Sequence, residues 1–264
     1  MAVTCWAKSL GGCSPIQSRE HYISKGLFEG DAVKLIGLPW CKFEEKTIGL
    51  ASASTKILCK THNERLSNLD DEAIRAFTSI REIFLLQSRQ KLLSPRFWKV
   101  QTWKVNGRLL ERWFLKTAIN LMHVQTQAIA WPGATEPRVP TTDVVDACFG
   151  LSPIRSPRGL HAVAAVGQDV ESSDYVSFAP LTDTTTQSFA GGIFEFRGIR
   201  FVLAWTDMNL EPFIRQVTIT TSLFANSNES RLLHPFKGIA FKVGDRRAQM
   251  LKIVWPPFSR ESYT

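Results

Sequence analysis

Four side chains in the first quarter of the chain suit a zinc ion: Cys5, Cys13, Cys59 and His62. Two residues separate Cys59 from His62, a spacing that presents two ligands from one tight turn. Seven residues separate Cys5 from Cys13, and the Gly11-Gly12 pair among them gives the backbone freedom to fold back. The spacing therefore predicts that both pairs meet at one structural zinc ion.

Three further residues stand beside these ligands. The dipeptide Glu20-His21 lies between the two pairs, and Asn63 directly follows His62. This order resembles that of the HNH, or ββα-metal, nuclease superfamily, and within it the recombination endonuclease VII-like and bacterial HNH proteins. In that family a zinc site supports an acid-histidine dipeptide on a β-hairpin and an asparagine that opens a helix. The resemblance covers residues 5 to about 70.

The resemblance implies a role for each residue. It places structural zinc on Cys5, Cys13, Cys59 and His62, a catalytic Mg²⁺ or Mn²⁺ on Glu20 and Asn63, and the general base at His21. The family more often has aspartate where this chain has Glu20, and cysteine where it has His62, and the stretch between His21 and Cys59 is longer than in compact members. Glutamate offers the same hard carboxylate oxygen as aspartate, with one more methylene of reach.

The chemistry of phosphodiester hydrolysis suits the same residues. A base must take a proton from the attacking water, and another group must offset the negative charge that grows on the phosphate. A histidine with an ordinary pKa of about 6.5 is mostly neutral at physiological pH and can accept that proton. A metal ion bound by two side chains keeps coordination positions for water and phosphate oxygens. His21, Glu20 and Asn63 are thus a minimal set for this reaction.

Each of these residues also has a non-catalytic interpretation. A Glu-His pair is commonly a surface acid beside a hydrogen-bonded histidine, and an asparagine such as Asn63 suits a helix cap. On this alternative the zinc fold is wholly structural, and the chain is a non-catalytic adaptor that binds nucleic acid or protein. A third interpretation takes the cysteines as small buried apolar residues without a metal.

Composition bears on the compartment and the partner. The content of 44% hydrophobic and 21% charged residues is normal for a globular protein. The five cysteines are an odd number, and the sequence suggests no disulfide partner for Cys41 or Cys148. No secretory signal precedes Cys5, so we expect the reducing cytoplasm. The apolar runs are too short for membrane insertion. The net charge of +8 favours a polyanionic partner.

Basic residues concentrate in one segment. Between Arg75 and Lys116 there are ten basic and two acidic side chains, an excess equal to that of the whole chain. Tryptophans are interleaved with them, which suits phosphate contacts and base stacking; the solvated faces of a helix and a strand would explain the same charges without a partner. The residues we single out for contact with nucleic acid are Arg89, Lys91, Arg96, Lys99, Lys104 and Arg108.

Apolar periodicity places the next elements. Ser67 is suited to cap a helix whose first turn contains Asp70, and helical spacing of apolar residues carries that helix to about Ser88. Residues 97–105 favour a strand, Asn106-Gly107 favours a turn, and residues 108–123 favour a second helix. The buried stripe expected for the first of these helices is Leu69, Ala73, Phe77, Ile80 and Phe84.

The second half of the chain changes in composition. Residues 131–159 are rich in Pro, Thr, Gly and Ser, which indicates a linker or long loop. Strands are favoured at 160–166, 174–179, 187–205, 216–224 and 236–254. We therefore expect an α+β protein: a zinc-stabilised ββα-metal (HNH or treble-clef) module at 1–70, a helical basic region at 71–130, the linker at 131–159 and a β-rich domain at 160–264.

These observations favour a metal-dependent endonuclease that hydrolyses phosphodiester bonds of nucleic acid, DNA rather than RNA. Its expected cofactors are structural Zn²⁺ and catalytic Mg²⁺ or Mn²⁺. The C-terminal half would then read substrate shape, dock a protein partner or hold a homo-oligomer together. Association with phage defence follows from the family resemblance alone.

Overall fold

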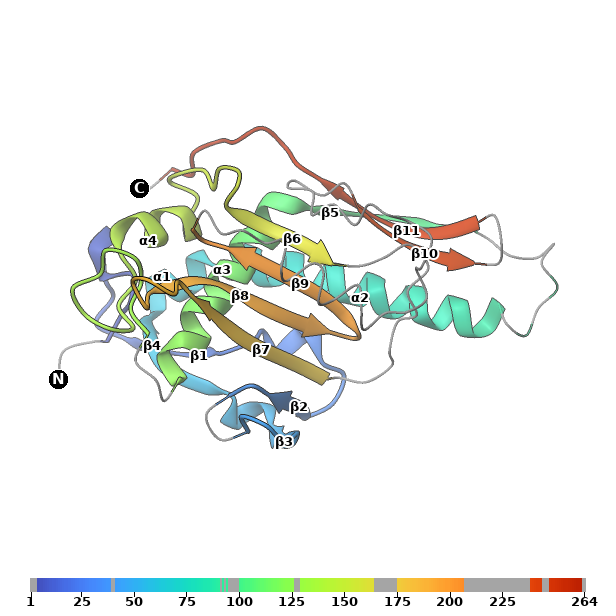
Figure 1. Ribbon diagram of the computed structural model, residues 1–264, viewed down its shortest axis with the longest axis horizontal. Coiled ribbons are helices and arrows are strands. Elements are labelled where there is room, and N and C mark those ends of the chain that lie inside the picture. Colours follow the sequence, from blue (N-terminus) through green and yellow to red (C-terminus); the bar gives the residue numbers. More distant parts are fainter. Residues whose placement is uncertain are drawn as a thin grey trace.

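The computed structural model describes residues 4–38, 41–90, 92, 94, 100–125, 129–163, 175–206, 238–243 and 247–262. It is a mixed α+β protein, as the sequence predicts, and its described strands form a two-stranded, a three-stranded and a six-stranded sheet around two long helices (Figure 1). Some predictions lie outside the described residues: the strand at 216–224, and Lys91, Arg96 and Lys99 of the basic segment.

The unit called here the N-terminal hairpin is a two-stranded sheet whose strands are distant in sequence, separated by residues 22–53. Strand β1 (Gln17–His21) pairs antiparallel with β4 (Ser54–Cys59), and helix α1 (Lys60–Arg65) follows β4 without an intervening residue. Short 3-10 helices lie before and between these elements, at Lys8–Leu10 (η1), Lys25–Leu27 (η2) and Leu50–Ser52 (η3). Strands β1 and β4 and helix α1 thus lie together, although other elements separate β1 from β4 in the sequence.

Two long helices form the centre of the molecule. Helix α2 (Ser67–Gln90) starts one residue after α1 and buries Leu69, Ala73, Phe77 and Ile80 of the predicted stripe. Ser67 is the first residue of α2 and not its cap. Helix α3 (Gly107–Val124) is buried on nearly every side, with Trp113, Phe114 and Leu115 fully enclosed.

The predicted turn at Asn106-Gly107 is wrong. Asn106 ends a strand and caps α3, since its side-chain oxygen accepts hydrogen bonds from the backbone N–H groups of Arg108 and Leu109 at 3.0 and 3.3 Å. An asparagine before a glycine suits a hairpin turn and a helix start equally well in isolation, and here the helix prevails because its apolar faces are buried.

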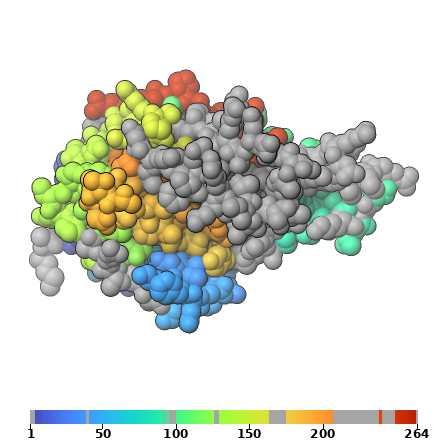
Figure 2. Space-filling model, viewed as in Figure 1, coloured from blue at the N-terminus to red at the C-terminus, as the bar shows by residue number. Residues whose placement is uncertain are grey.

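A six-stranded sheet combines strands from residues 32–49 with strands from residues 159–204. Strand β2 (Ala32–Ile36) pairs antiparallel with β3 (Lys46–Gly49) and parallel with β7 (Tyr175–Thr182). The sheet continues through β8 (Phe189–Phe196) and β9 (Ile199–Ala204) to β6 (Gly159–Val163), all antiparallel, in the order β3-β2-β7-β8-β9-β6. Figure 2 shows β2 and β3, in blue, at one edge of the molecule. The division expected between residues 1–70 and 160–264 is therefore crossed by a shared sheet.

A smaller sheet packs against α2. It has the order β10-β11-β5, in which the hairpin of β10 (Gly238–Val243) and β11 (Arg247–Val254) is antiparallel and β5 (Thr102–Asn106) joins β11 in parallel. A strand was expected at 97–105, and among the described residues of this range it begins at Thr102. Strand β5 comes from the middle of the chain, so this sheet also links the regions on either side of residue 160.

The segment 131–159 is not a simple linker. It contains helix α4 (Thr142–Cys148), whose Val144, Val145 and Cys148 are fully buried. The indole of Trp131, 1% exposed, packs against Phe189 of β8 with ring centroids 4.5 Å apart. The prolines of this segment led to the prediction of a linker. Its apolar side chains instead tie it into the core.

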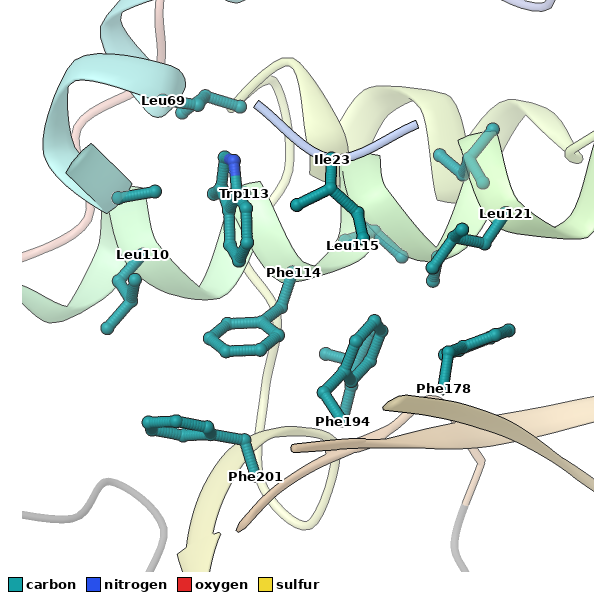
Figure 3. Packing of buried hydrophobic residues seen from close by; sticks show 14 of the residues in the cluster. Ile23, Leu69, Leu110, Trp113, Phe114, Leu115, Leu121, Phe178, Phe194 and Phe201 are labelled. Atoms are coloured by element: carbon teal, nitrogen blue, oxygen red, sulfur yellow. The ribbon is translucent and has the colours of Figure 1, made fainter. Parts of the chain in front are cut away.

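Aromatic rings fill the space between α3 and the six-stranded sheet. Phe114 points from α3 toward Phe194 and Phe201 of the strands (Figure 3), with ring centroids 5.1 and 4.9 Å apart. Burial of such rings contributes strongly to stability. Within the described part of the chain, no helix has both the length and the apolar character that crossing a membrane requires.

Candidate metal centre

The N-terminal segment lies beside strand β4, which brings Cys5 to Cys59. The backbone N–H of Trp6 donates to the carbonyl of Ile57 at 3.0 Å. The side-chain amide of Gln17 donates to the carbonyls of Thr4 and Leu58 at 2.6 and 2.7 Å, and so ties the same segment to the hairpin. Cys59 is the last residue of β4 and precedes α1, so His62 lies in the first turn of that helix.

Two glycines return the chain to the site. After η1, Gly11 and Gly12 have φ angles of +74° and +61°, in the left-handed region that favours glycine. This reversal brings Cys13 back toward Cys5, as the sequence predicts. The four side chains Cys5, Cys13, Cys59 and His62 form one group whose ligand atoms all lie within 4.8 Å of one another.

The donor set and its geometry fit zinc. The Nδ1 atom of His62 lies 3.3, 3.7 and 3.2 Å from the sulfurs of Cys5, Cys13 and Cys59. A tetrahedral zinc with usual bond lengths holds its sulfur and nitrogen ligands about 3.5 Å apart, which the three distances bracket. Three thiolates and one imidazole are a typical structural zinc set, without an open coordination position.

The pKa values of the four candidate ligands couple metal binding to the release of protons. Burial raises the pKa of the Cys5 thiol to about 12 and also raises that of Cys13. Burial acts in the same direction on Cys59, but hydrogen bonds from the backbone of His62 and Ser14 leave its pKa lowered. Burial and the nearby Arg65 lower the pKa of His62, which keeps the imidazole neutral and able to bind. Zinc must therefore displace protons from the thiols when it binds.

Aromatic rings line one side of the candidate metal site. The ring of Phe149, just after α4, meets the imidazole of His62 edge to face with centroids 5.6 Å apart. It also contacts the indole of Trp6 at 5.8 Å. Helix α4 packs against η1, which lies between Cys5 and Cys13. The segment expected to be a linker is thus a wall of the candidate zinc site.

Glu20 points into the protein and meets α3. Its side chain is buried, and its carboxylate oxygen Oε1 lies 2.7 Å from the ammonium nitrogen of Lys116. The side-chain amide of Asn120, one turn further along α3, donates to the same oxygen at 3.2 Å. Asn120 also donates to the backbone carbonyl of His21 at 3.3 Å. Two side chains of α3 therefore hold the end of β1.

Lys116 is shared with a second carboxylate. Its ammonium lies 2.8 and 2.7 Å from the two oxygens of Asp70, in the first turn of α2. Asp70 also accepts a hydrogen bond of 2.5 Å from the hydroxyl of Ser24, which accepts one from the indole N–H of Trp113 at 2.8 Å. Burial opposes the charged ammonium, but the two carboxylates outweigh it and raise the pKa of Lys116.

Asn63 has a different partner from Glu20. It is the fourth residue of α1, so it does not cap that helix, and its amide donates to the hydroxyl of Ser18 in β1 at 2.8 Å. This bond fixes α1 against the hairpin. Glu20 and Asn63 are thus bound to separate groups, α3 and Ser18.

His21 lies at the end of β1, opposite Ser54 of β4, and is partly buried. Burial lowers the pKa of its imidazole, and the positive charges of Lys25, Lys116 and Arg19 lower it further, against the opposing charge of Asp70. Lys25 and Arg19 are both exposed. His21 is consequently a neutral imidazole at physiological pH, with two exposed cations nearby.

The residues present do not fit a divalent metal held by Glu20 and Asn63. Mg²⁺ and Mn²⁺ need carboxylate oxygens that are free to coordinate, whereas the Glu20 carboxylate is buried against the ammonium of Lys116. A second cation at that oxygen would meet the charge of Lys116 at close range. The structural zinc therefore fits this chain, and the catalytic metal does not fit these two residues.

The described basic residues of this segment come from three elements, α2, β5 and α3. Arg89 is exposed near the end of α2, and Lys104 is exposed on β5. Arg108 donates through its Nε to the backbone carbonyl of Pro256 at 3.1 Å, which gives it a structural contact.

Sequence reasoning missed the roles of Lys116, Asp70 and Asn120. The signal was the spacing of Trp113, Lys116 and Asn120, which puts two polar residues on an otherwise apolar helix face.

Comparison with protein-family models, with curated proteins and with solved structures finds no match for this chain.

Proposed function

We propose that this chain is a zinc-stabilised endonuclease that hydrolyses nucleic-acid phosphodiesters, DNA in preference to RNA, with His21 as its general base. The observation that carries the proposal is the placement of His21 at the end of β1, opposite a strand that ends at the candidate zinc ligand Cys59 and leads directly into α1. The hydrogen bond from Asn63 to Ser18 holds the helix to the strand that carries His21.

The surroundings of His21 support the chemistry. A neutral imidazole can take a proton from an attacking water, and its lowered pKa keeps it neutral. The exposed cations Arg19 and Lys25 are placed to attract a phosphate and to offset the charge that develops on it. In this mechanism α3 orients His21 through Asn120, whose side-chain amide donates to the backbone carbonyl of His21.

Cleavage of plasmid DNA by purified, zinc-loaded protein tests the proposal, with and without added Mg²⁺ or Mn²⁺. The His21→Ala variant should lose cutting by a factor of about 10²–10⁴, the usual contribution of a general base. His123→Gln, which alters a histidine outside the hairpin, is the matched control and should cut like the wild type. Equal cutting by His21→Ala would refute the role of His21.

A second candidate function has its own supporting observation. The ion pair between Glu20 and Lys116 favours a non-catalytic adaptor that binds nucleic acid or protein. Lys116 occupies the carboxylate that would bind the catalytic metal in an HNH nuclease. On this proposal the protein binds labelled DNA but does not cut it, and His21→Ala binds as the wild type does. Charge reversal at Arg19 and Lys25 would reduce the affinity and its dependence on salt.

A further inference from the structure

The ammonium of Lys116 lies in a cage of carboxylate oxygens. Glu20 Oε1 is at 2.7 Å, and the two oxygens of Asp70 are at 2.8 and 2.7 Å. The Lys116 side chain is 3% exposed, and that of Glu20 is 6% exposed. The Asp70 side chain is 27% exposed, so two acids from β1 and α2 converge on a buried ammonium from α3 near the surface.

Oxygens gathered in this way resemble the ligands of a hard divalent cation. Such ions bind carboxylate oxygens at about 2.0–2.6 Å, somewhat closer than the oxygens lie to the ammonium nitrogen. An ammonium is a compact charge with three donors, and here each of the three oxygens can accept one of them. Asn120 and Ser24 donate to the same carboxylates and stabilise the remaining negative charge.

We propose that Lys116 is the built-in cation of this site: its ammonium takes the place between Glu20 and Asp70 that a divalent metal would take, and closes both carboxylates to metal. The inference rests on the proposed function in assigning the adjacent His21 to the reaction. Hydrolysis at His21 then draws on Arg19 and Lys25, and Glu20 is a positioning residue that anchors the strand end to α3.

Binding of Mn²⁺ to zinc-loaded protein, followed by electron paramagnetic resonance, tests this inference without any need for cleavage activity. The wild type and Glu20→Gln should bind Mn²⁺ alike, because Glu20 is closed. Lys116→Ala removes the ammonium and should acquire a tight Mn²⁺ site. The double variant Lys116→Ala/Glu20→Gln should lose that site, since one of its carboxylates is gone.

Two results would overturn the inference: Mn²⁺ binding to the wild type that disappears in Glu20→Gln, or a folded Lys116→Ala protein that gains no Mn²⁺ site. If Lys116→Ala does not fold, the comparison of the wild type with Glu20→Gln decides alone. Equal binding supports the built-in cation, and unequal binding refutes it. A protein that never cuts DNA would refute the proposed nuclease but leave these outcomes unchanged.

Discussion

The ammonium of Lys116 and the carboxylate of Glu20 form a buried ion pair, 2.7 Å apart, between α3 and the strand that carries His21. A buried charged side chain is compatible with a stable fold only when its partners are present, because an unpaired buried charge raises the free energy of the folded state. This pair therefore joins the stability of the protein to the position of the candidate active residue.

Loss of one partner should be strongly destabilising. We expect Lys116→Met, which keeps the apolar length but removes the charge, to lower the free energy of unfolding by about 3–5 kcal/mol. The matched control is Lys60→Met, which removes an exposed ion pair with Glu64 and should cost less than about 0.5 kcal/mol. Urea unfolding measures both. Similar small losses in the two variants would contradict the buried role of Lys116.

The cap of α3 predicts a smaller effect. Asn106→Ala removes the acceptor for the N–H groups of Arg108 and Leu109, and should lower the free energy of unfolding by about 1 kcal/mol. Asn106→Asp keeps an acceptor and should be close to the wild type. Thermal unfolding of the two variants side by side would separate them. A neutral Asn106→Ala variant would mean that water replaces the cap without loss.

The sequence predicted the parts of the site that depend on short spacings. Cys59 ends a strand and His62 lies in the first turn of the helix that follows. Gly11 and Gly12 reverse the chain before Cys13. Short sequence spacings were therefore sufficient to predict these ligands. Helix α2 was predicted from its apolar period for the same reason. Its observed end at Gln90 lies close to the expected Ser88.

The features that were missed depend on contacts between distant segments. The pairing of β2 with β7 joins residues about 140 positions apart, which no local pattern encodes. Lys116 was counted as one basic residue among ten, because its carboxylate partners come from β1 and α2. Helix α4 was hidden by the prolines around it, although Val144 and Val145 are fully buried.

Acid should weaken the fold through His123. Burial, helped by Arg138, lowers the pKa of His123 to about 4, below its value near 6.5 in the unfolded chain. The unfolded state thus takes up the proton first as the pH falls, so the stabilisation is complete above pH 6.5 and is lost between about 6.5 and 4. His123→Gln should reduce this loss by up to about 3 kcal/mol, measured by urea unfolding at several pH values. An unchanged pH dependence would contradict the assignment.

The ring of Phe149 should control the release of zinc. Phe149→Ala leaves a cavity against His62 and Trp6, so a chelator should remove the metal faster than from the wild type. Phe178→Ala removes another buried ring, one that packs on Phe194 in the large sheet, and is the control. A metal-sensitive dye follows the release. If both variants release zinc at the same rate, general destabilisation explains the effect and the specific contact does not.

Metal content is the most direct test, because both candidate functions rest on the zinc site. Elemental analysis of natively purified protein should find one bound zinc per chain, held by Cys5, Cys13, Cys59 and His62. Cys59→Ser should lose it, whereas Cys148→Ser, which changes a buried cysteine outside the cluster, should retain it. Protein that folds and contains no zinc, or a Cys59→Ser variant that keeps it, would contradict the zinc-stabilised module.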